Sequence, residues 1–202
     1  MSIIIYKLKD HSISMDQARY ATSIVAKYLD TATVKVSNKF YKTTFPSDMI
    51  FTNEDVSTSD EQVESLTREY NIHCRACIGS LIYLLSTRVD LSFAVHNLAR
   101  FSANPGKVHI EGLVHLLRYI RDNKTLGLKY YADLNDASVT DIMRHANITT
   151  KNHLMAFSDS SCQDCPDTGR STGEYIIFYQ GGPIDHGTHV PGPVAQSSAE
   201  SE

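Results

Sequence analysis

The middle of the chain repeats apolar residues with the period of an α-helix in three consecutive stretches. The first stretch places five apolar residues on one face: Cys77, Ile78, Leu81, Ile82 and Leu85. The second predicts a helix that begins after Asp90 as its N-cap and buries Leu91, Ala94, Val95, Leu98 and Phe101. The third predicts a helix over residues 107–121 that buries Leu113, Leu116, Leu117 and Ile120. Short connections between the three helices favour compact, mostly antiparallel packing.

Both flanks of this helical region show patterns that are typical of β-strands. β-Branched and aromatic residues predict strands over residues 3–8, 127–132, 153–158, 174–179 and 184–189. A helix with Ser14 or Asp16 as its N-cap follows the first strand. Residues 31–70 predict an irregular connector. Residues 133–151 predict a polar insertion with a short helix over 139–145, and another helix begins at 197. The predicted fold class is α+β.

Composition and charge narrow the class of protein. No run of about 18 apolar residues suggests a membrane span, and the N-terminus lacks a secretory signal, so we expect a cytoplasmic or nuclear protein that is not secreted. Residues 71–131 hold 8 Lys and Arg against 3 Asp and Glu, whereas residues 132–202 hold 3 against 10. A basic middle attracts phosphate and an acidic end attracts divalent cations, although ordinary solvated surface has the same composition.

The acidic end contains a candidate metal site. Asp159 ends a predicted strand, and Glu200 and Glu202 lie in the first turn of the last predicted helix. Carboxylates on adjoining elements can hold Mg²⁺, and two such ions can support cleavage of a phosphodiester bond. The alternative is structural, since Asp is common in turns and Glu is favoured in the first turn of a helix.

Cysteines and basic residues suggest two further sites. Cys74 with Cys77 and Cys162 with Cys165 form two C-x₂-C pairs, which could bind zinc, but the gap between the pairs is long and Cys77 lies on a core-facing stripe. The histidines are expected to be surface or half-buried residues. Several arginines interleaved with aromatic residues could contact phosphates or simply face solvent: Arg75, Arg88, Arg100, Arg118 and Arg121.

The order of short motifs resembles the end of the reverse transcriptase and the start of the RNase H domain in copia-type retrotransposon Pol polyproteins. Residues 13–20 resemble I-x-x-x-Q-x-x-Y, residues 74–84 and 87–91 resemble Y-R-x-L-x-G-S-L-x-Y-L and T-R-P-D-I, and residues 109–120 resemble a helix that ends in L-R-Y-L. Residues 158–160, 170–173, 182–184 and 197–202 resemble S-D-S, R-S-T-S-G, G-P-I and S-S-T-E-A-E. The resemblance covers residues 3–202.

This resemblance implies four segments. Residues 1–45 would be the end of the palm, 46–70 an irregular linker, 71–125 a helical thumb and connection, and 126–202 a truncated RNase H-like domain with a mixed sheet. Asp159 and Glu202 would be catalytic ligands of Mg²⁺. Four arginines would contact an RNA–DNA hybrid or a nucleic-acid duplex: Arg88, Arg100, Arg118 and Arg121. The rest of the Pol polyprotein is the expected partner, and a virus-like particle in the cytoplasm is one expected location.

The sequence also departs from the family pattern. The Y-x-D-D motif that carries the polymerase acids is absent, and Cys74, Cys77, Val89 and Cys162 replace residues that are usual at those positions. RNase H also needs carboxylates that follow the last motif. We therefore expect a fragment of a reverse transcriptase and ribonuclease H that is inactive alone. The alternatives are a non-catalytic nucleic-acid-binding remnant and a zinc-stabilised structural module.

Overall fold

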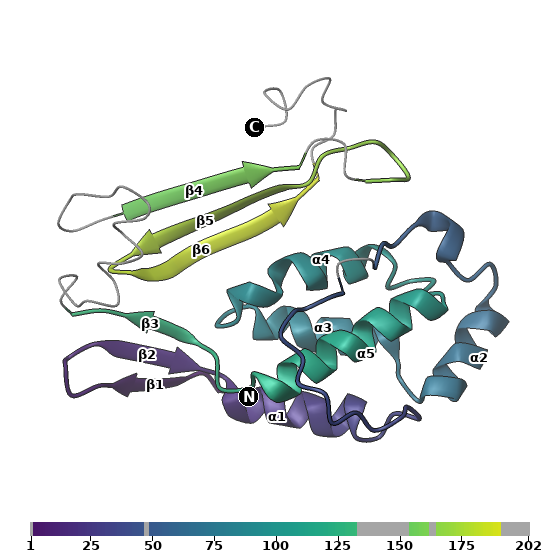
Figure 1. Ribbon diagram of the computed structural model, residues 1–202, viewed down its shortest axis with the longest axis horizontal. Helices are drawn as coiled ribbons and strands as arrows, with labels where there is room; N and C mark the ends of the chain where they lie inside the picture. Colours follow the sequence, from purple (N-terminus) through teal and green to yellow (C-terminus); the bar gives the residue numbers. More distant parts are fainter. Residues whose placement is uncertain (1, 47–48, 133–153, 162–164, 191–202) are drawn as a thin grey trace. The chain divides into compact units, whose positions relative to one another are not determined.

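The computed structural model describes residues 2–46, 49–132, 154–161 and 165–190 (Figure 1). The chain divides into two compact units. The helical unit is formed mainly by residues 17–126, and the strand unit by residues 3–16 together with those that follow residue 126. The described elements confirm an α+β protein with helices and two small antiparallel sheets. The predicted helices at 139–145 and from 197 lie outside the described residues.

The described residues of the helical unit form five α-helices: α1 Ala18–Ile24, α2 Asp60–Tyr70, α3 Cys74–Leu84, α4 Ser92–Arg100 and α5 Lys107–Asp122. Shorter helical turns are η1 Val25–Leu29, which continues α1 as a π-helix, and the 3₁₀ turns η2 Asn53–Asp55 and η3 Val89–Leu91. The three helices that the periodicity predicts are therefore confirmed as α3, α4 and α5. All three are amphipathic, and each buries an apolar stripe.

The main hydrophobic core lies inside the helical unit. Every residue of this cluster falls between Ala21 and Ile120, and α5 supplies the largest share of it. The buried stripe of α3 differs from the predicted one. Leu84 and Cys74 are buried, whereas the side chain of Ile82 is 53% exposed. The prediction was wrong for Ile82. The face of α3 that packs on the core is centred on Cys77 and Leu81, and Ile82 lies at the solvent side of this face.

None of the three residues predicted as N-caps has that role, since Ser14 and Asp16 lie in strand β2 (Ile13–Asp16) and Asp90 lies in η3. Gln17 precedes α1, and its Oε1 accepts a hydrogen bond from Thr87 Oγ1 at 2.8 Å instead of capping the helix. Leu91 precedes α4, and no side chain caps this helix. The carboxylate of Asp90 accepts hydrogen bonds from Arg88, two residues earlier. Tyr119 Oη also donates to Asp90, so this carboxylate is engaged by other side chains and does not cap α4.

Helix α2 occupies residues for which the sequence predicts an irregular connector, so that prediction was wrong for Asp60–Tyr70. The missed signal is a helix start. Ser59 Oγ accepts a hydrogen bond from the Gln62 N–H, and Gln62 Oε1 in turn accepts one from the Thr58 N–H. The helix ends at Asn71, whose backbone is left-handed with φ of 53°.

The strand unit contains two three-stranded sheets in which every described pairing is antiparallel. The first sheet has the order β1 Ile4–Lys7, β2 Ile13–Asp16 and β3 Leu128–Tyr130. The second has the order β4 Leu154–Ser160, β5 Gly173–Tyr179 and β6 Gly182–His189. All five predicted strands are confirmed, with ends shifted by a few residues. Gln180 and Gly181 join β5 to β6 with φ values of 50° and 71°, as in the tight turn that suits a twisted hairpin.

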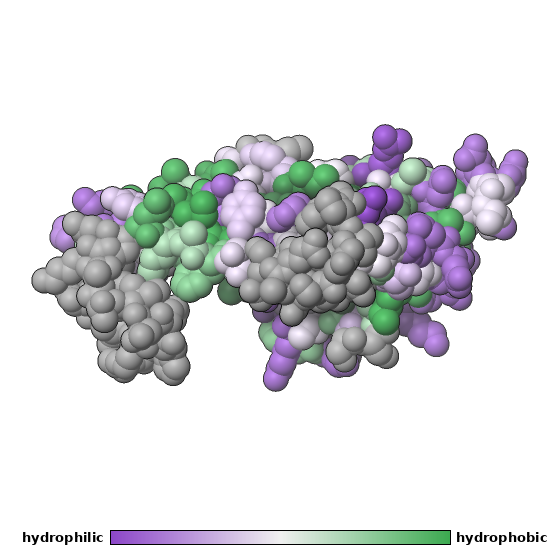
Figure 2. All heavy atoms as spheres, turned by 90° about the horizontal axis from the view of Figure 1, so that it is seen from above, coloured by the Kyte–Doolittle hydropathy of each residue, from purple (hydrophilic) through white to green (hydrophobic). Residues whose placement is uncertain are grey.

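The β4–β5–β6 sheet leaves much of its apolar surface uncovered by the described chain. Leu154 is 69% exposed, Ile184 51% and Phe157 42%. Hydrophobic residues gather over this sheet, at the left of Figure 2. The sheet has register and hydrogen bonds but no core of its own among the described residues.

Candidate functional site

Asp159 lies near the end of β4, which is an edge strand of its sheet. The register places Asp159 opposite Glu174 of β5, and Glu174 opposite Thr188 of β6. Directly opposed residues of an antiparallel sheet point to the same face, so these three side chains form one row. Thr188 Oγ1 donates to Glu174 Oε1 at 3.1 Å, and Asp159 Oδ1 accepts from the Ser160 N–H at 2.9 Å.

Asp159 lines a pocket of about 310 Å³. Its lining also includes Glu174, Tyr175 and His189. The described residues contain no group of three or more His, Cys, Asp or Glu side chains that could hold a metal ion. The exposed carboxylate of Asp159 nevertheless has the chemistry of a Mg²⁺ ligand, because Mg²⁺ is commonly held by only one or two carboxylates together with water and phosphate oxygens. Glu200 and Glu202 lie outside the described residues.

The guanidinium of Arg88 is buried inside the helical unit, with a side-chain exposure of 1%. It donates to both carboxylate oxygens of Asp90, at 2.8 and 2.7 Å, and to the backbone oxygen of Asn123 at 3.0 Å. Asp90 also accepts a hydrogen bond from Tyr119 Oη. A bidentate pair of this kind fixes η3 and α4 against the end of α5. Because its guanidinium is buried and fully engaged, Arg88 is not available to contact the phosphates of a nucleic acid, and its role is structural.

Arg118 and Arg121, in the last turns of α5, also bind the protein itself. Arg118 Nη2 donates to the backbone oxygen of Lys35 at 2.8 Å, and Arg121 Nη1 donates to that of Ser37 at 3.2 Å. Arg121 also pairs with Asp122 at 2.8 Å. The two side chains therefore hold residues 35–42 against α5 instead of standing free as a basic face. Arg100 is exposed on α4, and its guanidinium lies over the ring of Phe101.

Asp122 belongs to the same contact network and is partly shielded from water. Burial works to raise the pKa of its carboxyl, but hydrogen bonds from Arg121 and from the Tyr41 N–H outweigh this effect and hold that pKa below its ordinary value. The carboxylate therefore stays ionised while it fastens Tyr41 to α5.

The first C-x₂-C pair faces the core of the helical unit. Cys74 and Cys77 are both buried as free thiols, and burial raises the pKa of Cys74 to about 12 and that of Cys77 further. Zinc binds thiolates, so this environment opposes a zinc role for the pair. In the second pair, Cys165 is buried and Cys162 lies outside the described residues.

His109 is fully buried, which contradicts the expectation of surface or half-buried histidines. Its ring stacks on Phe101 with centroids 4.2 Å apart, and Nδ1 accepts a hydrogen bond from the Gly106 N–H at 3.0 Å. Burial lowers the pKa of this imidazole. A neutral His109 thus supports the start of α5, and it is a structural residue.

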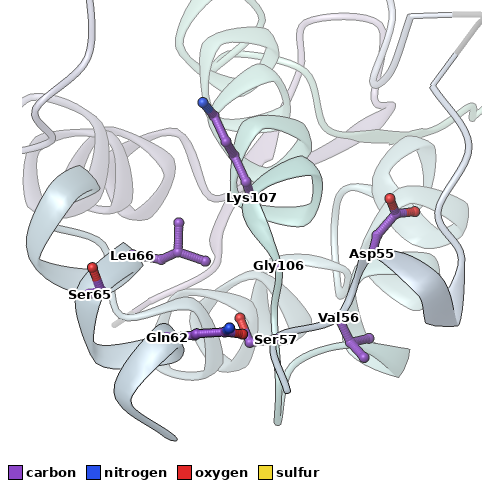
Figure 3. Close-up of a pocket in the computed structure, with 8 residues that line it drawn as sticks. All are labelled: Asp55, Val56, Ser57, Gln62, Ser65, Leu66, Gly106 and Lys107. Carbon is purple, nitrogen blue, oxygen red and sulfur yellow. The ribbon is translucent and has the colours of Figure 1, made fainter. Parts of the chain in front are cut away.

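A second pocket, of about 320 Å³, lies in the helical unit (Figure 3). Its lining comes from α2, from the start of α5 and from the η2 segment. The polar groups of this pocket mainly hold its walls: Asp55 accepts hydrogen bonds from Thr52, and Ser57 Oγ donates to the backbone oxygen of Pro105. No described pair of lining residues forms a nucleophile with an adjacent base. The described helices also include none with the length and apolarity needed to cross a membrane.

Comparison with known proteins gives several relatives. The chain is 30% identical over 128 residues to the retrovirus-related Pol polyprotein from transposon RE1 of Arabidopsis thaliana, a match that covers 63% of this chain and 8% of that protein. It is 29% identical over 133 residues to the secreted RxLR effector protein 161 of Plasmopara viticola, covering 65% of this chain and 82% of that one. It is 33% identical over 90 residues to the uncharacterized mitochondrial protein AtMg00240 of Arabidopsis thaliana, covering 45% and 67%.

Several relatives are retrovirus-related Pol polyproteins of copia-type transposons. They are about 30% identical to this chain over 63% of its length, in agreement with the resemblance of the sequence motifs. The chain spans less than a tenth of the length of the polyproteins that it matches. No family model matches the chain, and no solved structure matches it.

Proposed function

We propose that this chain corresponds to the end of the reverse transcriptase and the start of the RNase H domain in a copia-type Pol polyprotein. The function of that region is RNA-directed DNA synthesis together with cleavage of the RNA strand in an RNA–DNA hybrid. The relatives named Pol polyproteins support the assignment at the level of the family. The motif order supports the finer assignment, with the helical unit as thumb and connection and the β4–β5–β6 sheet as the first strands of RNase H.

One observation carries the RNase H part of this proposal. The exposed carboxylate of Asp159 lies on β4, the first strand of an antiparallel sheet whose strands follow one another in sequence order. This edge of the sheet is covered by no described strand. The family that the motifs resemble has its first metal ligand at this position. Glu174 stands opposite on the same face and adds negative charge beside it. Glu202 is the second ligand that we propose.

Asp159 would hold Mg²⁺ there, and the ion would supply activation of water and stabilisation of the leaving oxygen of a phosphodiester. The chain's own residues contribute the placement of the carboxylate. Asp159 is part of the β4–β5 ladder, and its Oδ1 is oriented by the Ser160 N–H. The backbone of a paired strand moves little, so the carboxylate keeps its direction without help from a loop.

Paramagnetic NMR of the full chain tests this role of Asp159. Mn²⁺, which prefers the same oxygen ligands as Mg²⁺, is titrated into ¹⁵N-labelled protein, and we expect broadening centred on the amides of residues 159 and 174. Asp159→Asn should remove this broadening. Asp185→Asn, on the neighbouring strand β6, is the matched control and should leave it unchanged. Broadening elsewhere, or broadening that survives Asp159→Asn, would refute the metal role.

A second candidate function is binding of nucleic acid without catalysis. The excess of 8 basic over 3 acidic residues between positions 71 and 131 favours it. Such binding should weaken steeply as the salt concentration rises, because it releases counterions from the phosphates. Titration of the full chain with a labelled duplex at two salt concentrations measures this dependence.

A further inference from the structure

An irregular segment of the helical unit, which begins directly after Asp30, carries positive charge and contains no acidic residue. Residues 31–45 contain Lys35, Lys39 and Lys42 and no Asp or Glu. All three lysines are exposed, and no described carboxylate forms an ion pair with any of them. Phe40 lies between two of these lysines and is 55% exposed. The segment therefore offers charge and an aromatic face within eight residues.

The end of α5 fastens this segment through its backbone. Arg118 and Arg121 bind the carbonyl oxygens of residues 35, 37 and 39. Asp122 accepts from the Tyr41 N–H, and Asn123 Nδ2 donates to the Tyr41 carbonyl. The last fastening is His115, whose Nε2 lies 3.0 Å from the backbone oxygen of Thr43. Irregular backbone is held here at several points, although it lies outside any helix or sheet.

These hydrogen bonds to the backbone determine which side chains of the segment face solvent. Tyr41 is buried, with the guanidinium of Arg118 5.6 Å from its ring centre and His115 in edge-to-face contact. Because Tyr41 turns inward, its neighbours Phe40 and Lys42 are left on the outside. Lys39 Nζ lies 6.0 Å from the Tyr41 ring centre, so the charge of Lys39 lies close to the ring that anchors this segment. Behind the lysines, the charge of Arg121 is balanced by its ion pair with Asp122, whereas no described carboxylate forms an ion pair with the guanidinium of Arg118.

We propose that residues 35–42 form a binding surface for single-stranded nucleic acid. The lysine ammonium groups contact phosphates, and a base stacks on the exposed ring of Phe40. Lysines along a backbone path with an aromatic stacking platform are the usual means of binding single strands without sequence preference. The paired bases of a duplex offer no free face to a single phenylalanine. The inference rests on the proposed function only in taking nucleic acid as the ligand.

Fluorescence anisotropy with the full chain tests this surface. The probes are a labelled 12-nucleotide oligothymidylate and a labelled duplex of the same length. Phe40→Ala should weaken binding of the single strand by about 5- to 150-fold, the range for loss of one stacked base. Phe93→Ala is the matched control, since Phe93 is 43% exposed on α4 and should have no effect.

Charge is tested in the same assay. Lys39→Gln should lower the slope of log affinity against log salt by about 0.7, the value for one phosphate contact to a single strand. Lys107→Gln is its control, because Lys107 lies at the opposite end of α5, roughly 20 Å along the helix axis. Circular dichroism of each variant verifies that it folds.

The outcomes separate this inference from the proposed function. Weaker binding by Phe40→Ala and Lys39→Gln but not by the controls supports the surface. If both variants bind as tightly as the wild type, the proposed binding surface is wrong, but nucleic acid still binds to another face of the protein. Equal affinity for duplex and single strand with no effect of Phe40→Ala would also overturn it. The test of Asp159 with Mn²⁺ is independent of all these results.

Discussion

The helical unit and the β4–β5–β6 sheet differ in how they bury apolar side chains. In the helical unit the apolar stripes of α3, α4 and α5 meet in one core, and Leu81, Leu117 and Ile120 are fully buried. In the sheet, Leu154 and Ile184 are mostly exposed although their strands, β4 and β6, both pair with β5. Hydrogen bonds define the register of a sheet, but a three-stranded sheet gains most of its stability from what packs on it. The helical unit should therefore tolerate less change than the sheet.

The largest effect is expected at the buried pair of Arg88 and Asp90. Asp90→Ala leaves the guanidinium of Arg88 buried without its partner, which costs about 3–5 kcal/mol of unfolding free energy. Urea unfolding of the full chain, followed by circular dichroism at 222 nm, measures this loss. Glu64→Ala is the control, because Glu64 and Arg68 form an exposed pair worth about 0–1 kcal/mol. Similar losses for the two variants would contradict the structural role of Arg88.

A core truncation sharpens the comparison within a single helix. Leu81→Ala removes a fully buried side chain and should cost about 2–5 kcal/mol, since a cavity remains behind. Ile82→Ala, one residue further along α3, changes a side chain that is 53% exposed and should cost well under half as much. The same urea titration compares them. An equal cost would mean that Ile82 also faces the core.

A smaller, pH-dependent effect is expected from His109. Burial lowers the pKa of His109 in the folded state, so the unfolded chain binds a proton more readily. The stability from the neutral imidazole is complete above the unfolded pKa, about 6.5, and is lost as the pH falls below it. The unfolding free energy should thus decrease between about pH 7 and pH 5.

His109→Gln should flatten part of this decrease. His115, whose pKa is also lowered by burial, contributes in the same direction. The dependence of stability on pH should therefore be flatter still in a variant in which both His109 and His115 are replaced by glutamine. Unfolding titrations at several pH values measure the slope. A wild type whose stability is unchanged over this range would show that neither imidazole has to stay neutral in the folded protein.

The smallest effect is expected on the sheet. Replacing exposed Leu154 and Ile184 with Ser should change the unfolding free energy by no more than about 0.5 kcal/mol for each residue. The double variant should also bind less of an apolar dye such as ANS, because it removes exposed hydrophobic surface. Thermal unfolding and dye fluorescence measure the two effects. A loss of several kcal/mol would show that another part of the chain covers these residues.

Much of the fold could be predicted because its signals are local. The apolar period of α3, α4 and α5 and the β-branched content of the strands are short-range patterns, and the structure confirms all of these elements. Helix α2 was missed because its apolar residues are few and polar residues dominate it. Its start, with Ser59 and Gln62, was nevertheless present in the sequence.

The candidate sites were harder to predict, because their residues depend on partners far away in the chain. Arg118 and Arg121 have the sequence pattern of a basic helix face, yet they bind backbone oxygens more than 80 residues earlier. The lysines of residues 35–42 were overlooked, since no periodicity marks this segment. The sequence correctly placed Asp159 near the end of a strand. That Glu174 lies directly opposite it is known only from the register of the two strands. The metal role of Asp159 and Glu202 stays a prediction.

The sequence by itself determined the class of fold, most of the elements and the resemblance to copia-type Pol polyproteins, because periodicity, turn residues and motif order are properties of the linear chain. Only the tertiary structure decided which charged groups are buried, which are fastened to the backbone and which face solvent. Arg88, Arg118 and Lys39 differ in these respects although all are basic residues in the same unit. The reason is physical: the cost of burying a charge depends on the partners that folding brings to it.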